Sequence, residues 1–275
     1  MQWFTFARAP RLTIFVGVLF GCLFAAAAAR AATTDTWIGN SGPEWGTNGN
    51  WTTTNASGIP ATGDTLVFDG TGNSGVPSDD NLGNAFSIAT LNFVNNAGSY
   101  TLTSHSGAND QSLSIATSLI VQSSGATQTI NMPIVGTGTL QMGGTPAAPD
   151  TSGNATLVLN ANAQFNALSS NINNGTGDTI QLGNNSTLTI NGNIQTSVLN
   201  PMPTVSSTSN LTITGTTSGT GTLIGNSATA LLQVGLISGA PASGVVPTTT
   251  LDLSGLNTFS FTGLEADIGG NQSTQ

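Results

Sequence analysis

The heptapeptide STLTING, which runs from Ser186 to Gly192, decides the fold class because a close copy, SNLTITG, runs from Ser209 to Gly215. Both segments place Leu and Ile on either side of a threonine and end on glycine. Alternation of apolar and polar residues with a period of two is typical of a half-buried β-strand. Repetition of one such strand–turn unit indicates a stacked array of strands.

Short strands of the same kind are predicted through most of the chain, with Asn, Gly and Ser between them. They are expected at 65–68, 86–93, 99–103, 112–122, 127–134, 139–142, 155–160, 179–182, 187–190, 211–214, 222–224, 230–234, 250–253 and 258–261. No window after residue 35 has a sustained helical period. Regularly spaced strands without helices leave either a sandwich or barrel, or a parallel β-solenoid. Few aromatics after residue 70, sharp Asn/Gly turns and the repeated unit favour the all-β parallel β-helix.

Three of the four tryptophans lie near the start of this ladder, at Trp37, Trp45 and Trp51. A solenoid exposes its apolar cross-section at each end and needs a cover there. We therefore expect residues 32–70 to form a Trp-rich N-terminal cap and residues 71–275 to form the β-helix region. The alternative for the three tryptophans is sugar binding, in which exposed rings stack on a carbohydrate.

The first 31 residues are typical of a cleaved signal peptide. Arg8 and Arg11 precede an apolar run from Leu12 to Phe24, and the small residues of Ala29-Arg30-Ala31 form a cleavage signal. Two alternatives remain open at this point, a membrane anchor and a lipid anchor on Cys22. A secreted or cell-surface protein is the expectation.

Charge excludes one class of partner. The chain has only three Lys and Arg against twelve Asp and Glu, and all three basic residues lie within the predicted signal peptide. Affinity for nucleic acid depends on Lys and Arg, so no nucleic-acid partner is expected. The only cysteine, Cys22, also leaves with the signal, so the mature chain has no disulfide or thiolate chemistry.

Catalytic residues are scarce, and no catalytic site is expected. The single histidine, His105, lies in a polar turn and is interpreted as exposed. Three carboxylate pairs are candidates for glycoside hydrolysis, namely Asp64 with Asp69, Asp79 with Asp80, and Glu265 with Asp267. We instead expect Asp64 to anchor a turn, Asp79 and Asp80 to be solvated in a loop, and the last pair to protect a strand edge.

No cofactor or metal site is expected either. The segment Asn174-Gly175-Thr176-Gly177-Asp178 has some likeness to a calcium-binding nonapeptide repeat, but it occurs once and without the full spacing. Loop carboxylates and Asn carbonyls allow at most weak Ca²⁺ binding.

At this point the chain resembles the bacterial autotransporter-associated β-strand repeat proteins. The residues that carry the resemblance are Trp37-x-Gly39, Trp45, Asn50-Trp51, Ile59-Pro60, Gly63-Asp64-x-x-x-Phe68, Ser87-Ile88, Leu91-x-Phe93, Tyr100-Thr101-Leu102, 127–131, 219–223 and the repeat-like segment 251–263. The family pattern LTLSGxNTYTG is matched with Asp252 in place of Thr and Phe259 in place of Tyr. The resemblance covers most of residues 35–263 and implies a right-handed β-helix on the cell surface or in the medium, without catalytic residues.

One departure concerns the C-terminus. Autotransporters end in a membrane β-barrel, whereas this sequence reaches Gln275 without one. The chain is therefore expected to be a fragment or a relative that uses another export route.

The function that these observations predict is structural or adhesive, exerted by an extracellular β-helical passenger. The expected partners are polysaccharide or other copies of the same chain. The alternative is a carbohydrate-binding module or a polysaccharide-active enzyme.

Overall fold

The computed structural model describes residues 31–72, 78–83, 85–94, 97–105, 112–122, 125–145, 148–149, 154–171, 177–198, 208–217, 219–238, 248–268 and 271–272. From Ala32 onward these residues belong to one compact unit. The described residues form strands and turns and contain no helix, so the all-β prediction is confirmed for this part of the chain.

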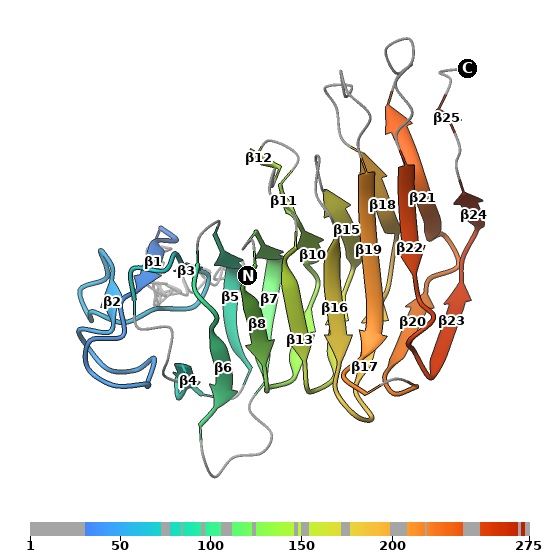
Figure 1. Cartoon of the computed structure of the whole chain (residues 1–275). Coiled ribbons are helices and arrows are strands. Elements are labelled where there is room, and N and C mark those ends of the chain that lie inside the picture. The colour runs from blue at the N-terminus through green and yellow to red at the C-terminus, as the bar shows by residue number, and fades with distance from the viewer. Residues whose placement is uncertain are drawn as a thin grey trace, which may run out of the picture. The chain divides into compact units, whose positions relative to one another are not determined.

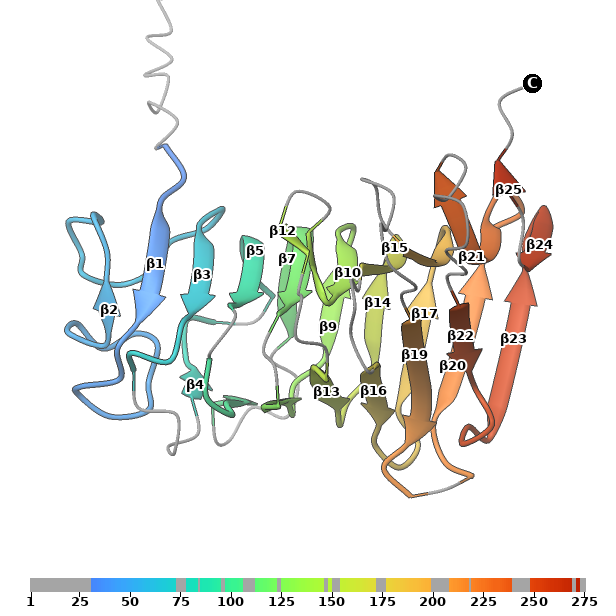
Figure 2. The same ribbon diagram turned by 45° about the horizontal axis from the view of Figure 1, so that its top comes forward.

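Most strands lie parallel in columns that we call the first, second and third faces (Figures 1 and 2). The first face contains β4 (Ser78–Asp80), β6 (Thr101–Ser104), β8 (Thr127–Ile130), β13 (Thr156–Leu159), β16 (Asp178–Leu182), β19 (Thr208–Gly215) and β22 (Thr248–Asp252). The second contains β9 (Ile134–Gly136), β14 (Ala163–Phe165), β17 (Thr187–Ile190), β20 (Thr222–Asn226) and β23 (Thr258–Thr262). The third contains β10 (Thr139–Met142), β15 (Ala167–Asn171), β18 (Ile194–Val198), β21 (Leu231–Ser238), β24 (Glu265–Ile268) and β25 (Asn271–Gln272).

The chain visits the three faces in turn, so that β8, β9 and β10 form one rung and β13, β14 and β15 form the next. The rung of β13, β14 and β15 pairs in parallel with the rung before it and with the rung after it. Parallel strands in curled sheets are consistent with a β-solenoid. A short antiparallel hairpin of β11 (Gly144–Thr145) and β12 (Ala148–Pro149) follows β10.

The second and third faces both begin at one long strand, because different parts of it pair with different strands. β5 (Phe86–Phe93) pairs along its length with β7 (Leu113–Val121), but β7 pairs with β9 through Leu113–Ile115 and with β10 through Ser118–Val121. The corner between β9 and β10 contains Gly138, and a Cβ atom there would lie 2.6 Å from the backbone carbonyl carbon of Thr117. The corner therefore packs directly on the backbone of β7, which only glycine allows.

Apolar side chains form continuous columns inside the stack because residues of equal phase pair in register. Leu119, Leu140, Leu168 and Ile194 follow one another on the third face, each 1% exposed or less. Burying a Leu or Ile side chain contributes about 1.5–3 kcal/mol. The alternating strand pattern of the sequence is the source of this core, since every second residue points inward.

The N-terminal segment shares a sheet with the ladder. β1 (Thr34–Trp37) pairs in parallel with β3 (Thr65–Phe68), and β3 pairs in parallel with β5. β2 (Trp51–Thr52) pairs antiparallel with β1. Residues 32–70 are therefore continuous with the strand region in hydrogen bonding.

Several strand predictions are confirmed and others are wrong. The strands expected at 65–68, 86–93, 139–142 and 187–190 have the observed bounds. The single strand expected at 127–134 is two strands, β8 and β9, separated by a turn at Met132 and Pro133. The strands that the sequence pattern did not predict are β1, β2, β4, β11, β12, β14, β15, β18, β24 and β25.

Candidate functional site

The three tryptophans considered for sugar binding lie together inside the fold. Trp37, Trp45 and Trp51 are 1%, 0% and 4% exposed. The ring of Trp51 meets Trp37 edge-on with centroids 5.0 Å apart, and it meets Trp45 edge-on at 5.8 Å. Its Nε1 group donates a 2.9 Å hydrogen bond to the carbonyl oxygen of Trp45. Because no ring face is open to solvent, this structure gives a sugar nothing to stack on there.

The aromatic cluster continues into the ladder through Phe68. Its ring lies 6.1 Å from Trp37, 5.2 Å from Phe93 and 4.9 Å from Tyr100, measured between centroids. Such contacts contribute about 0.5–1.5 kcal/mol each beyond the buried area. The tryptophans thus pack on the first strands of the stack.

Beside the tryptophans, two aspartates form a buried carboxyl pair that the sequence analysis did not find. Asp35 and Asp64 are both fully buried, and their side chains lie within hydrogen-bonding reach of one another. Asn55 links them, because its Nδ2 lies 2.9 Å from Asp64 Oδ2 and 3.4 Å from each oxygen of Asp35. The Thr33 and Thr53 hydroxyls donate to Asp35 Oδ1.

The two carboxyl groups have opposite shifts in pKa. Burial raises the pKa of Asp35, the Thr53 hydroxyl opposes this, and the neighbouring Asp64 carboxylate raises it further. Burial alone would raise the pKa of Asp64 too, but hydrogen bonds from the Thr33 and Ala61 amides and from Asn55 outweigh burial and hold it well below its usual range. As the pH falls, Asp35 is therefore the first of the two to take up a proton, and Asp64 stays ionised to lower pH.

This pair joins three segments of the N-terminal region. Asp64 Oδ1 accepts from the Thr33 amide at 2.9 Å and Oδ2 accepts from the Ala61 amide at 2.8 Å, so its predicted anchoring role is confirmed. Asp35 belongs to β1, two residues before the buried Trp37, and the period of a strand places both on the inward side. This alternation of inward and outward residues in β1 is the sequence signal that could have predicted the burial of Asp35. Because both carboxyl groups are closed from solvent, the pair holds segments of the chain together and is not open to a substrate.

The other carboxylates of the three candidate pairs have different surroundings. Asp69 Oδ1 accepts from the amide and hydroxyl of Thr71, at 2.9 and 2.6 Å, and closes a turn. The expectation that Asp80 is solvated is wrong, because Asp80 lies in β4, is fully buried and accepts from the Leu82 amide at 3.0 Å. Glu265 and Asp267 lie within the edge strand β24, on the same side of it.

His105 is the residue directly after β6 and is only partly exposed. Its backbone amide donates to the Asp80 carbonyl oxygen at 3.1 Å. The segment with the likeness to a calcium repeat lies mostly outside the described residues. Among the residues that are described, no group of three or more His, Cys, Asp or Glu converges to hold a metal ion. The same part of the chain contains no helix long and apolar enough to cross a membrane.

The outer surface is organised in columns of small polar side chains. On the first face Thr127, Thr156, Thr179 and Thr212 follow one another in register, each partly or fully exposed. On the second face Thr187, Thr222 and Thr258 do the same. Hydroxyl groups therefore recur at the strand spacing of about 4.8 Å along the stack.

Comparisons with family models, with curated proteins and with solved structures gave no match to this chain. The resemblance to autotransporter-associated repeats therefore stays a prediction from the residues quoted above.

Proposed function

We propose that this chain is exported and acts outside the cell as a β-helical passenger with a structural or adhesive role. The observation that carries the proposal is the set of in-register polar columns on a parallel stack, which presents many equivalent neutral hydrogen-bonding groups to the surroundings. Weak contacts repeated along a rigid surface add up by multivalency.

Two finer features of the architecture belong to this proposal. The stack is right-handed, in agreement with the strong preference for right-handed connections between parallel strands of one sheet. The segment with Trp37, Trp45 and Trp51 is its N-terminal cap, because these rings cover the apolar side chains of the first strands.

Composition supports a place outside the cell. The signal-like start, the lack of Lys and Arg from residue 31 onward and the lack of any later cysteine all agree with an exported chain that binds neither nucleic acid nor anionic lipid. The resemblance to the passenger family points in the same direction.

Catalysis is the less favoured alternative. Among the described residues, the carboxyl pair of Asp35 and Asp64 is fully buried, and Asp64 is bound to two backbone amides, so no substrate reaches this pair. A glycosidase needs both carboxyl groups open to the sugar on either side of the scissile bond.

Localisation in a Gram-negative host tests the proposal. The full chain and residues 32–275 are expressed in parallel, and antibodies detect each protein in cytoplasm, periplasm, medium and on intact cells. We expect the full chain to lose its first 31 residues and to appear on the surface or in the medium, while residues 32–275 stay in the cytoplasm. Retention of the full chain in the cytoplasm, or release of reducing sugar from any polysaccharide by the purified protein, would overturn the proposal.

A further inference from the structure

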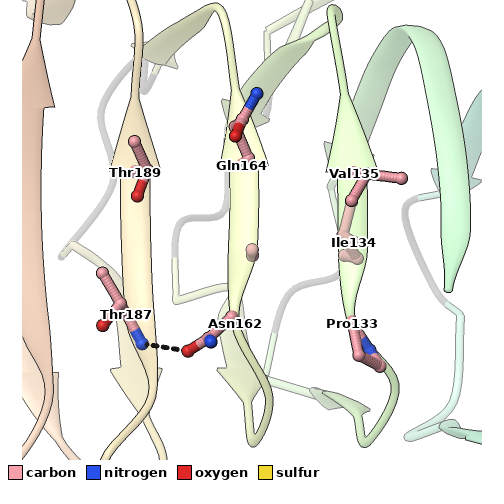
Figure 3. Close-up of a pocket in the computed structure, with 8 residues that line it drawn as sticks. Pro133, Ile134, Val135, Asn162, Gln164, Thr187 and Thr189 are labelled. Carbon is pink, nitrogen blue, oxygen red and sulfur yellow. Dashed lines mark hydrogen bonds between the residues drawn. The ribbon is translucent and has the colours of Figure 1, made fainter. Parts of the chain in front are cut away.

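The second face carries a groove that crosses three consecutive rungs. It has a volume of about 340 Å³ and lies over β9, β14 and β17. The buried residues Ile134 and Ala163 line it together with six more exposed side chains, those of Pro133, Val135, Asn162, Gln164, Thr187 and Thr189. Figure 3 shows these side chains in two rows, with Thr189, Gln164 and Val135 in one and Thr187, Asn162 and Pro133 in the other. Register explains the rows, because Gln164 pairs with Thr189 and Ala163 pairs with both Leu188 and Ile134.

Hydrogen bonds hold the floor and one wall of the groove in place. The Asn162 carbonyl oxygen accepts from the Ile134 amide at 3.0 Å, and its side-chain Oδ1 accepts from the Thr187 amide at 2.9 Å. The second bond fixes which way the Asn162 amide points and leaves its Nδ2 group to donate to a ligand. The wall is therefore organised before any ligand arrives.

The lining chemistry selects a neutral, hydroxyl-rich ligand. The groove is lined by amide and hydroxyl groups, with Pro133 and Val135 as an apolar strip, and Val135 is 44% exposed. None of the lining side chains is ionisable. A pyranose ring has the matching surfaces, since its C–H face packs on apolar side chains while its hydroxyls bond to amides and hydroxyls.

The direction of the groove favours an extended chain. Equivalent side chains recur about 4.8 Å apart along the stack, which is close to the length of one sugar unit in an extended polysaccharide. A peptide strand would instead need an unpaired sheet edge. Here β14 is paired on both sides, with β9 and β17.

We propose that this groove binds an extended neutral polysaccharide that runs along the stack across β9, β14 and β17. The proposal rests on the adhesive function above and gives that function a site and a ligand class. Anionic polysaccharides bind less well, because twelve carboxylates and no Lys or Arg follow residue 30.

Affinity electrophoresis of purified residues 32–275 tests the site, with soluble β-glucan, mannan and xylan as neutral probes and alginate as the anionic probe. The main variant is Gln164→Glu, which replaces an amide donor in the groove with a charge. Its matched control is Gln181→Glu, the same substitution at an outward position of the first face. Val135→Thr removes the apolar contact with little change in shape, and the urea midpoint of each variant reports whether the fold is intact.

We expect at least one neutral polysaccharide to retard the protein and alginate to retard it less. Gln164→Glu and Val135→Thr should each weaken that binding about tenfold, and Gln181→Glu should leave it unchanged. Equal binding by all variants would overturn the groove as the site while the adhesive function stands. Failure of every neutral probe to bind would overturn the groove proposal, and the localisation experiment would still decide the extracellular role on its own.

Discussion

At the residue scale, some buried side chains form hydrogen bonds with backbone groups that have no partner in a neighbouring strand. Gln128 is fully buried, its Oε1 accepts from the Tyr100 amide at 3.0 Å and its Nε2 donates to the Gly98 carbonyl oxygen at 3.0 Å. Asp178 does the same for the amide of Ala155, through Oδ1 at 3.0 Å. These side chains link one rung to the next where a backbone group has no strand partner.

Gln128→Leu should lower the free energy of unfolding by about 1–3 kcal/mol, because a buried amide and a buried carbonyl lose their partner. Urea unfolding followed by circular dichroism measures the change. Gln181→Leu is the control, since Gln181 faces outward on the first face. Similar losses in the free energy of unfolding for the two variants would show that the hydrogen bonds of Gln128 do not stabilise the contact between rungs.

The carboxyl pair makes a prediction about pH. The lowered pKa of Asp64 contributes stability above the ordinary value of 3.8 that is lost as the pH falls through the folded pKa. The raised pKa of Asp35 contributes stability while this group is protonated, and that contribution is lost as the pH rises through its folded pKa. The pair therefore stabilises the fold most between these two pKa values.

Two amide variants separate the members of the pair. Asp35→Asn stays neutral and keeps a donor toward Asp64, so it should remove the loss of stability on the alkaline side. Asp64→Asn should cost about 1–3 kcal/mol at neutral pH, because the Thr33 and Ala61 amides lose a charged acceptor. Urea unfolding from pH 3 to pH 8 measures both. A pH profile of Asp35→Asn parallel to that of the parent would contradict the raised pKa of Asp35.

At the scale of the element, the proposed N-terminal cap can be tested at Trp51. Trp51 contacts Trp37, Trp45 and Phe68, and its burial removes a large apolar surface from water. Trp51→Ala should cost about 3–5 kcal/mol and make the remaining ladder aggregate or unfold without cooperativity. Thermal melting with light scattering measures both effects.

The control for Trp51→Ala is an aromatic residue in the last rung of the stack, at the C-terminal end. Phe259→Ala removes an aromatic ring that is 39% exposed, and it should cost well under half as much. Tryptophan emission of residues 32–275 should be blue-shifted and poorly quenched by iodide. Red-shifted emission together with an unchanged melting temperature in Trp51→Ala would contradict the cap.

How far the sequence predicts the elements depends on where their apolar residues come from. β10 and β17 each alternate Leu and a second apolar residue with polar ones, so local pattern was enough. β14 reads Ala-Gln-Phe and β15 reads Ala-Leu-Ser-Ser-Asn, which lack β-branched residues. These strands exist because the rungs on either side offer paired backbones. Such support is non-local and leaves no trace in a short window.

In the candidate sites, too, some features follow from local sequence and others only from residues that are distant in the chain. The burial of Asp64 at a turn could be predicted from its own neighbours, whereas its carboxyl partner Asp35 lies in a strand with no matching local signal for pairing. The groove on the second face could not be predicted, because Val135, Gln164 and Thr189 become neighbours only through the register of three rungs.

At the scale of the whole described stack, the two ends differ. At the N-terminal end Trp37 and Trp45 are at most 1% exposed. At the C-terminal end the last rung of β22, β23 and β24 pairs on one side only among the described residues, and Ile268 is 75% exposed. The corresponding position one rung earlier, Val234, is 9% exposed. Each rung contacts only its neighbours, so stability is distributed along one dimension.

In a protein that consists of residues 32–275, that one-sided last rung would determine the response to a mechanical load. A force that pulls the C-terminus away from the stack acts on one row of hydrogen bonds at a time, so the rungs should peel off in succession from that end. Each step should lengthen the chain by roughly 10 nm, at about 3.4 Å per extended residue. Optical tweezers would record a staircase of small extensions at low force, whereas a single abrupt rupture would mean that the rungs yield together. A stack built in this way would dissipate the energy of a pull in small portions before its tryptophan-lined end unfolds.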